Sequence, residues 1–258
     1  MRVYPEVKIN LGLSVLRKRE DGFHDLETLF LPCDAFRDEL SIEPASGTEG
    51  SFELIGGSWA PETDLSYRAW AMLRDEFGIA PVNMRLVKGS PVGAGLGGGS
   101  ADAACALRAL SEMFSLGLDD AALASRAAKL GSDCAFFVYG RPMFGEGRGE
   151  VLTPYEIDLD AYRLELVIPR GSAVSTREAY ASVLTRDAHP ELGRLPLREA
   201  LALPVEQWRD ALVNDFEYSV FPAHPEIAAA KRELYECGAV YASMSGSGAA
   251  VFGLFRRK

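Results

Sequence analysis

The stretch that decides the fold runs from Pro91 to Leu110 and reads PVGAGLGGGSADAACALRAL. Five of its first ten residues are glycine, and a segment rich in alanine and leucine follows at once. Each glycine weakens regular structure, because the unfolded chain has more conformational freedom to lose. A helix starting near Ser100 would offer unpaired N–H groups and the positive end of its dipole, which together bind phosphate. The stretch therefore predicts an anion-binding loop at the start of a helix.

The glycine loop, residues 93–99, could also belong to a tight turn, a Walker motif or a dinucleotide-binding fold. A tight turn needs left-handed residues, but five glycines in seven positions exceed what one turn requires. The Walker pattern needs a lysine after the last glycine, where this chain has Ser100. Residues 93–98 do satisfy G-x-G-x-x-G, so a dinucleotide-binding fold is an alternative. The Lys88 and Pro91 that precede the loop disfavour it, because that fold needs a buried apolar strand there.

The bulk composition excludes several classes of protein. The chain has 258 residues, 48% of them apolar and 25% charged, which is ordinary for a globular protein. Its net charge of -10 argues against nucleic acid or an anionic membrane as the main partner. The four cysteines are widely spaced and form no CxxC motif, so we expect neither a zinc site nor disulfides. Free cysteines fit a protein of the reducing cytoplasm. We find no signal-peptide pattern and no apolar run of the ~20 residues that span a bilayer.

Hydrophobic periodicity predicts a fold of mixed strands and helices. Apolar and polar residues alternate over 7–15, as in a strand with one buried face. Further strands are expected at 26–32, 38–43, 51–55, 82–86 and from 164, with a closing hairpin over 240–255. Helices are expected at 65–77, 101–114, 119–129, 196–202, 204–217 and 225–237, and one more behind the capping-box spacing of Ser175 and Glu178. The fold class is therefore α+β, with domains at residues 1–155 and 156–258.

Two further motifs accompany the glycine loop. They are EVKINLGL (6–13) near the N-terminus and SMSGSGAAVF (243–252) near the C-terminus. Together with PVGAGLGGGSADAA (91–104), in this order and spacing, they resemble the three motifs of the GHMP small-molecule kinases. The resemblance spans nearly the whole chain. It implies a two-domain GHMP kinase fold with an ATP-binding N-terminal domain, a substrate-binding C-terminal domain and an active site in the interdomain cleft.

Shorter motifs narrow the resemblance to one branch of that family. They are KREDGFHDLETLF (18–30), LGSDCAFF (130–137), GEGRGEVL (145–152), VSTREAY (174–180) and NDFE (214–217). They are similar to the branch that phosphorylates a cytidine diphosphate ester on the non-mevalonate route to isoprenoid precursors. The resemblance thus implies a small-molecule cytidine-diphosphate substrate, with ATP and Mg²⁺ as cofactors. Another GHMP kinase acting on a different alcohol, or a binding module without catalysis, are the alternatives.

The resemblance assigns catalysis to Asp133 and Lys8. Asp133, in the family's Gly-x-Asp motif, would be the general base, because phosphoryl transfer asks for positioning, charge stabilisation and an acceptor for the hydroxyl proton. Lys8, on the polar face of the first strand, would keep Asp133 charged and orient the substrate hydroxyl. The residues alone leave two plainer alternatives open. Asp133 could cap a helix that follows Ser132, and Lys8 could lie on a solvated strand face.

Nucleotide binding is assigned by the same resemblance to the glycine loop and its flanks. The residues implied are Lys88, Pro91, Gly93, Ala94, Gly95, Leu96, Gly97, Gly98, Gly99 and Ser100. Ser100 and Asp102 could also contact Mg²⁺, but both side chains are equally typical of a helix cap, so the metal ligands stay unassigned. Lys88 could instead be a solvated lysine at the end of a strand.

Substrate recognition is implied for Asn10, Phe23, His24, Thr176 and Tyr180. The pair Phe23 and His24 would recognise cytosine, with the phenyl ring stacked on the base and the imidazole bonded to its edge. Tyr180 would close a sandwich around the base, while Asn10 and Thr176 would supply polar contacts. Simple core packing is the plainer alternative for the aromatic rings.

Some positions depart from the pattern of this branch. Phe23 stands where tyrosine is usual, so one hydroxyl is lost but the ring remains. Ser132, Cys134 and Ala135 replace the commoner neighbours of the base, which we expect to be tolerated. Asp64 stands where an asparagine often contacts adenine, which leaves the adenine contact open at this position.

Overall fold

Two long strands, β2 (Glu6–Lys18) and β3 (His24–Arg37), carry the chain between two structural units. The computed structural model describes residues 1–257. Unit 1 consists of Met1–Lys8, Pro32–Val92 and Gly97–Arg141, and unit 2 of Ile9–Leu31, Gly93–Leu96 and the chain from Pro142 onward. Each unit contains both sheets and helices, so the expected α+β class is confirmed.

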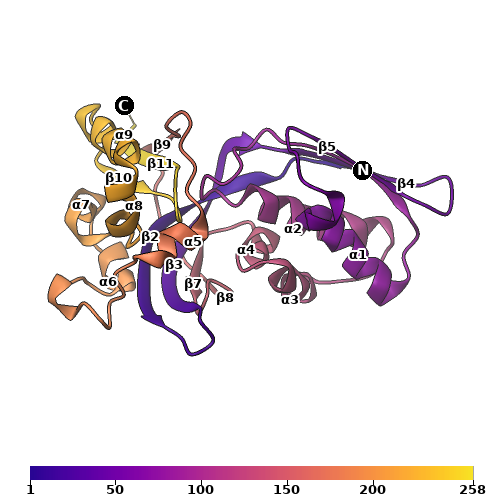
Figure 1. Ribbon diagram of the computed structural model, residues 1–258, viewed down its shortest axis with the longest axis horizontal. Helices are drawn as coiled ribbons and strands as arrows, with labels where there is room; N and C mark the ends of the chain where they lie inside the picture. Colours follow the sequence, from indigo (N-terminus) through magenta and orange to yellow (C-terminus); the bar gives the residue numbers. More distant parts are fainter. Residues whose placement is uncertain (258) are drawn as a thin grey trace. The chain divides into compact units, whose positions relative to one another are not determined.

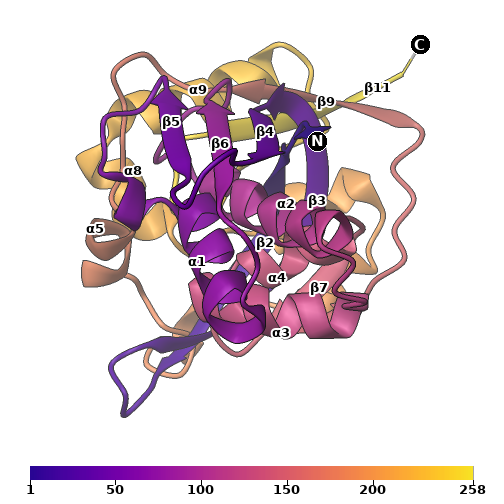
Figure 2. The ribbon, with the colours of Figure 1, turned by 90° about the vertical axis from the view of Figure 1, so that its right-hand side faces the viewer.

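Unit 1 is a four-stranded sheet with helices on one side. Its strands, in the order β1-β4-β6-β5, are β1 (Arg2–Val3), β4 (Glu39–Pro44), β6 (Val82–Val87) and β5 (Ser51–Ile55). The helices are α1 (Leu65–Phe77), α2 (Gly98–Met113), α3 (Asp120–Leu130) and α4 (Cys134–Tyr139). Figures 1 and 2 both show these helices gathered below the sheet. Strand β4 pairs antiparallel with β6, and β5 pairs parallel with it.

Local sequence signals explain where two of these helices begin and end. The Asp64 side chain accepts a hydrogen bond from the Ser66 N–H and caps α1, and Gly78 ends the helix in the left-handed conformation. The Asp119 side chain accepts from the Ala122 N–H and caps α3. Both helices therefore lie where the sequence predicts them, α1 with identical bounds.

Unit 2 contains two sheets. The first has the order β2-β3-β7-β8, with β7 (Met143–Glu146) and β8 (Val151–Pro154). The second has the order β10-β11-β9, with β9 (Tyr162–Val167), β10 (Tyr241–Met244) and β11 (Val251–Arg256). The hairpin predicted at the end of the chain is the antiparallel pair β10–β11.

The described part of unit 2 also contains five α-helices. They are α5 (Thr176–Ala181), α6 (Leu197–Leu201), α7 (Trp208–Ala211), α8 (Glu217–Ala223) and α9 (Pro225–Glu236). Helix α9 lies along the β10-β11-β9 sheet (Figure 1). The core between them includes Ile227 and Leu234 of α9, Val251 of β11, and Leu13 and Val15 of β2. The capping-box expectation is confirmed at the start of α5, where the Ser175 hydroxyl accepts from the Glu178 N–H.

The continuous helix expected over 204–217 is wrong. Helix α7 ends at Ala211, Leu212 is extended, and α8 begins only at Glu217. The intervening residues pair with β2: the Leu13 N–H donates to the Val213 carbonyl at 3.0 Å, and the Asp215 N–H donates to the Leu13 carbonyl at 2.8 Å. A strand partner far away in the sequence thus replaces the local helical hydrogen bonds. Helix α4 corresponds to the helix after Ser132, which the sequence offers only as part of the alternative to a catalytic role for Asp133.

Candidate functional site

Helix α2 begins directly within the glycine loop. Gly97 is its N-cap in the left-handed conformation, with φ of 73°, and the Ala101 N–H donates to the Gly97 carbonyl. The helix thus starts at Gly98, earlier than the expected start near Ser100. The first N–H groups of any helix have no acceptor inside it. Here those groups belong to Gly98, Gly99 and Ser100, which therefore form a suitable end for binding an anion.

The glycines of the loop lack side chains for different reasons. A Cβ on Gly95 would collide with the Ser245 carbonyl oxygen, and one on Gly98 with the Ser90 hydroxyl. A Cβ on Gly97 would come within 2.9 Å of the Phe137 ring. A Cβ on Gly99 would meet nothing within 4 Å, and this residue does not have a positive φ. Internal packing therefore explains three of these glycines but not Gly99.

The remaining residues assigned to the loop differ in their burial. Ala94 and Leu96 are buried, and the Ala94 carbonyl accepts a hydrogen bond from the Ala250 N–H at 3.0 Å. Pro91 is half-buried and opens the turn. Gly93 has a φ of 72° and open space where a Cβ would lie.

Lys8 and Asp133 form an ion pair next to the start of helix α2. The Lys8 Nζ lies 3.3 Å from the Asp133 Oδ2. Lys8 is buried, whereas about a third of the Asp133 side chain, 31%, is exposed. A Cβ on Gly97 would lie 3.2 Å from the Lys8 Cε, so the lysine stem runs directly past the helix start. Two residues far apart in sequence thus meet at the N-terminal end of α2.

The plainer alternatives for these two residues do not hold. Asp133 stands at the N-cap of α4, but its side chain makes no capping hydrogen bond. Lys8 is 3% exposed and so does not lie on a solvated face.

Cys134 follows Asp133 and lies next to Ser100. Burial raises the pKa of the Cys134 thiol to about 11, and a hydrogen bond with the Ser100 side chain opposes this only in part. The thiol is therefore protonated at neutral pH and is not a nucleophile. This departure from the branch pattern is accommodated as a buried side chain against Ser100.

Lys88 belongs to a buried charged cluster with Asp38 and Asp102. Its Nζ donates to an oxygen of Asp38 and, at 2.6 Å, to the Asp102 Oδ2, and its side chain is only 4% exposed. The solvated alternative for this lysine is therefore wrong. Asp38 also accepts from the Gly89 and Ser90 N–H groups, each at 2.7 Å, and from the Ser90 hydroxyl at 2.8 Å. The cluster thus ties the segment before the glycine loop to helix α2 after it.

The two carboxyl groups of this cluster differ in ionisation. Burial raises the pKa of Asp102 to about 8, and the Lys88 ammonium offsets this only in part. The Asp102 Oδ1 is buried and has no hydrogen-bond partner among the described residues. Burial also opposes the ionisation of Asp38, but its bonds with Lys88 and Ser90 outweigh it and lower the pKa of that carboxyl. Asp38 is therefore the ionised partner of Lys88.

Asp64 serves the fold. Its Oδ1 accepts from the Ser66 N–H at 2.8 Å, and its Oδ2 accepts from the Trp59 indole at 2.8 Å. Both oxygens are therefore engaged in holding the start of α1.

Asn10, in unit 2, lies next to the turn that joins β10 and β11. Its backbone N–H donates to the Ser245 hydroxyl at 3.2 Å, and its side-chain amide donates to the Thr28 hydroxyl at 3.0 Å. The Thr176 and Ser247 hydroxyls lie 3.5 Å apart at the same turn. Asn214 also holds this turn, because its amide donates to the Met244 and Gly246 carbonyls, both at 2.8 Å.

The aromatic residues assigned to the base contact different neighbours. The His24 ring stacks on Tyr180, with centroids 4.7 Å apart and planes 21° apart, while the Phe23 ring packs against the Arg148 guanidinium at 4.8 Å. Phe23 is 54% exposed. Adjacent side chains on an extended backbone point to opposite sides, so the two rings reach different neighbours. Burial lowers the pKa of His24, with Lys18 contributing, which favours the neutral imidazole.

Sequence reasoning missed Asp38 and Asn214 as residues that shape the site. Asp38 lies 50 positions from Lys88, and Asn214 lies 30 from Met244. Neither spacing has a local pattern, although Asn214 does belong to the NDFE motif. Within residues 1–257 there is no cluster of three or more histidine, cysteine or acidic side chains placed to hold a metal ion. No helix in that range has the length and apolar character needed to cross a membrane.

Comparisons with known proteins agree with this geometry. The family model for the GHMP kinases N terminal domain matches residues 64–141, and the model for the GHMP kinases C terminal region matches residues 197–258. The 4-diphosphocytidyl-2-C-methyl-D-erythritol kinase of Bacteroides thetaiotaomicron is 46% identical over 99% of this chain and 92% of its own length. The enzyme of that name from Azobacteroides pseudotrichonymphae is 42% identical over 100% of this chain and 94% of its own. A crystal structure of 4-(cytidine 5'-diphospho)-2C-methyl-D-erythritol kinase superposes with a TM-score of 0.80 and 34% identity, covering 98% of this chain and 90% of that one.

Proposed function

Because the chain belongs to the GHMP kinase family, in the branch of the 4-diphosphocytidyl-2-C-methyl-D-erythritol kinases, we propose that it transfers the γ-phosphoryl group of ATP to the 2-hydroxyl of 4-diphosphocytidyl-2-C-methyl-D-erythritol. It is thus a phosphotransferase with an alcohol acceptor on the non-mevalonate route to isoprenoid precursors. The acidic net charge of -10 supports a small-molecule substrate rather than nucleic acid or a membrane surface as its partner.

The observation that carries this proposal is the position of the Lys8–Asp133 pair. A carboxylate and an ammonium 3.3 Å apart lie beside the glycine-capped start of a helix. An ion pair with a purely structural role would not need the neighbouring N–H groups of Gly98 and Gly99. Phosphoryl transfer needs both the proton acceptor of the ion pair and the N–H donors that bind phosphate.

In the proposed reaction each of these groups has one task. The substrate oxygen forms a bond to the γ-phosphorus as the bond to the β,γ-bridging oxygen breaks, and ADP leaves. Asp133 accepts the proton of the substrate hydroxyl. Lys8 orients Asp133 and the hydroxyl, and the N–H groups at the start of α2 bind phosphate oxygens.

The chain has features that fit ATP, and Mg²⁺ is part of the proposal. The open space at Gly99 and the helix N-terminus suit a polyphosphate. Mg²⁺ would neutralise phosphate charge when bound, and it is usually held by the nucleotide's own phosphates with few protein ligands.

Several finer assignments belong to the same proposal. Residues 1–155 would provide most of the ATP site, and residues 156–258 would contribute to substrate binding. Cytosine recognition is proposed for Phe23, His24 and Tyr180, with polar contacts from Asn10 and Thr176. A cytoplasmic location is proposed too, because all four cysteines are free thiols in the described chain.

The variant Asp133→Asn tests the catalytic assignment. The amide cannot accept the proton, so kcat should fall by at least about 100-fold while the dissociation constant for ADP stays close to that of the unmodified enzyme. A coupled assay for ADP release and calorimetric ADP titration measure the two quantities. The matched control is Asp119→Asn, because asparagine caps a helix as well as aspartate does. Near-normal turnover by Asp133→Asn would remove Asp133 from its proposed role.

A substrate panel separates the alternatives to this function. ATP consumption should occur with the cytidyl substrate and not with mevalonate or galactose. Activity with another alcohol alone would indicate a different GHMP kinase. ATP binding without turnover of any alcohol would indicate a binding module.

A further inference from the structure

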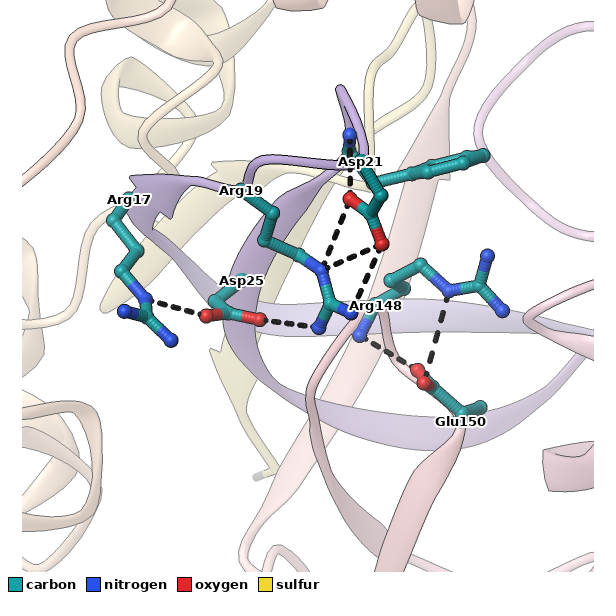
Figure 3. A network of polar contacts seen from close by, with 7 residues as sticks. Arg17, Arg19, Asp21, Asp25, Arg148 and Glu150 are labelled. Carbon is teal, nitrogen blue, oxygen red and sulfur yellow. Dashed lines mark hydrogen bonds and ion pairs between the residues drawn. The ribbon is translucent and has the colours of Figure 1, made fainter.

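The tip between strands β2 and β3 is held by a network of charged side chains in unit 2. Figure 3 shows Arg19 between two carboxylates, those of Asp21 and Asp25. Asp21 precedes the dipeptide Phe23-His24, and Asp25 follows it. One guanidinium therefore bridges both sides of the two residues proposed to recognise the base.

The contacts of Arg19 have the geometry of a fork. Its Nε lies 3.2 Å and 3.1 Å from the two Asp21 carboxylate oxygens, and its Nη2 lies 3.0 Å from the Asp21 Oδ2. Its Nη1 donates to the Asp25 Oδ1 at 2.9 Å. A planar guanidinium presents N–H donors along two edges and so reaches two carboxylates that lie on different sides of it, whereas an ammonium donates from a single atom.

The network extends to the backbone of the dipeptide. The Asp21 Oδ1 accepts from the Phe23 N–H at 3.1 Å, so the carboxylate that Arg19 orients also holds Phe23. The Arg19 N–H donates to the Phe23 carbonyl at 2.8 Å, and the Gly22 N–H donates to the Arg19 carbonyl at 3.2 Å. Both backbone and side-chain hydrogen bonds thus stabilise this turn.

We propose that Arg19 is a positioning residue for recognition of the cytosine end of the substrate: it fixes the backbone on both sides of Phe23-His24 and thereby presents the two rings. This inference rests on the proposed function. Arg19 itself need not touch the substrate.

Solvent exposure explains why Arg19 matters for order rather than for global stability. The side chains of Arg19 and Asp21 are 36% and 45% exposed, and single ion pairs at such positions contribute little to folding. Ordering a flexible turn before the ligand arrives is a separate contribution, because the entropy of ordering is then not lost on binding. The expected effect therefore falls on substrate affinity, while the folded state persists without Arg19.

Arg17 offers a matched control on the same hairpin. Its Nε donates to the Asp25 Oδ2 at 2.6 Å, and its side chain is 66% exposed. It thus resembles Arg19 in type, charge and neighbourhood, but among the described residues its ion pair is with Asp25 alone (Figure 3). Removal of the Arg17 side chain leaves the ion pair of Arg19 with Asp21 intact, and with it the hydrogen bond from the Phe23 N–H to Asp21.

The first experiment compares steady-state kinetics of Arg19→Ala and Arg17→Ala. Arg19→Ala should raise the KM for the cytidyl substrate about tenfold, with kcat and the KM for ATP nearly unchanged. Arg17→Ala should stay within about twofold of the unmodified enzyme in all three. Arg19→Lys should recover only part of the loss, because a single ammonium replaces donor atoms on two edges of the guanidinium. Equal effects of Arg19→Ala and Arg17→Ala, or equal losses for both substrates, would overturn the inference.

A second experiment asks whether Arg19 acts through the dipeptide. In the background Phe23→Ala/His24→Ala, the further change Arg19→Ala should leave kcat/KM for the cytidyl substrate unchanged, because there are no rings left to present. The quantity kcat/KM remains measurable below saturation. A further loss of the same size as in the unmodified background would show that Arg19 acts by another route.

The outcomes separate this inference from the function on which it rests. If the unmodified enzyme does not phosphorylate the cytidyl substrate, the proposed function fails. If it does and Arg19→Ala behaves like Arg17→Ala, the function stands and only the role of Arg19 is refuted.

Discussion

At the scale of single residues, Gly99 differs from the other glycines of its loop. Gly95 and Gly98 lie against other groups of the protein, and Gly97 has the left-handed conformation that caps α2. Gly99 lies in the first turn of α2, is exposed, and has open space where a Cβ would point. Alanine would be the better helix former there by up to about 1 kcal/mol. A ligand that approaches the backbone gives a physical reason for glycine at this position.

The substitutions Gly99→Ala and Gly95→Ala should therefore have opposite profiles. Gly99→Ala should leave thermal stability unchanged or slightly raised and weaken ATP binding about tenfold, because the methyl group occupies the space of the phosphates. Gly95→Ala should cost about 2 kcal/mol or more of unfolding free energy, since its φ is 76° and the Ser245 carbonyl lies in the way. Thermal melts and calorimetric titration measure both. Unchanged ATP affinity in Gly99→Ala would exclude direct phosphate contact at this glycine.

At the scale of elements, one charged cluster links three pieces of unit 1. Asp38 stands between β3 and β4, Lys88 follows β6, and Asp102 belongs to α2. Two carboxyl groups share one ammonium in a buried setting, so one of them is better protonated than ionised. The raised pKa of Asp102, about 8, and its unpartnered Oδ1 identify it as the protonated one.

Asp102→Asn should change how stability depends on pH. In the folded state Asp102 binds its proton up to about pH 8, whereas the unfolded chain releases it near 3.8. Between these values the folded state holds more protons, so its stability falls as pH rises. Asparagine imitates the neutral form, and the unmodified protein should lose about 1.4 kcal/mol of unfolding free energy relative to it for each pH unit within this window. Urea unfolding at a series of pH values tests this, and parallel curves for the two proteins would contradict it.

At the scale of the whole molecule, neither structural unit is formed by one continuous segment of the sequence. Unit 2 takes residues from the start, the middle and the end of the sequence. Leu13 and Val15 of β2 share a core with Phe216 and Ile227, and the Val15 N–H donates to the Asp215 Oδ2 at 2.8 Å. The core of unit 2 thus depends on contacts across about two hundred positions.

Separate expression of residues 1–155 and 156–258 tests how the chain divides. We expect the fragment 156–258 not to unfold cooperatively on its own, because the strand that contributes Leu13 and Val15 to its core is missing. Circular dichroism and thermal melts of each fragment and of their mixture measure this. A sharp melting transition of 156–258 alone would show instead that the second half is an independent domain.

The local features of the fold could be predicted from the sequence. The helix α1 is bounded by Asp64 and Gly78, whose capping preferences depend only on neighbouring residues. The strand alternation of β2 and the hairpin β10–β11 are similarly local. The pairing of residues 213–215 with β2 could not be predicted, because strand partners so distant leave no pattern in either segment.

The sequence by itself determined the chemistry: three glycine-containing motifs, the first of them with a lysine, the helix that follows the glycine loop, and the family to which they belong. These follow from propensities and backbone sterics, which act over a few residues. Only the tertiary structure decided that Lys8 meets Asp133, that Lys88 is buried between Asp38 and Asp102, and that Phe23 and His24 turn to different neighbours. Charges and rings choose partners by distance in space, and that distance exists only once the segments have packed together.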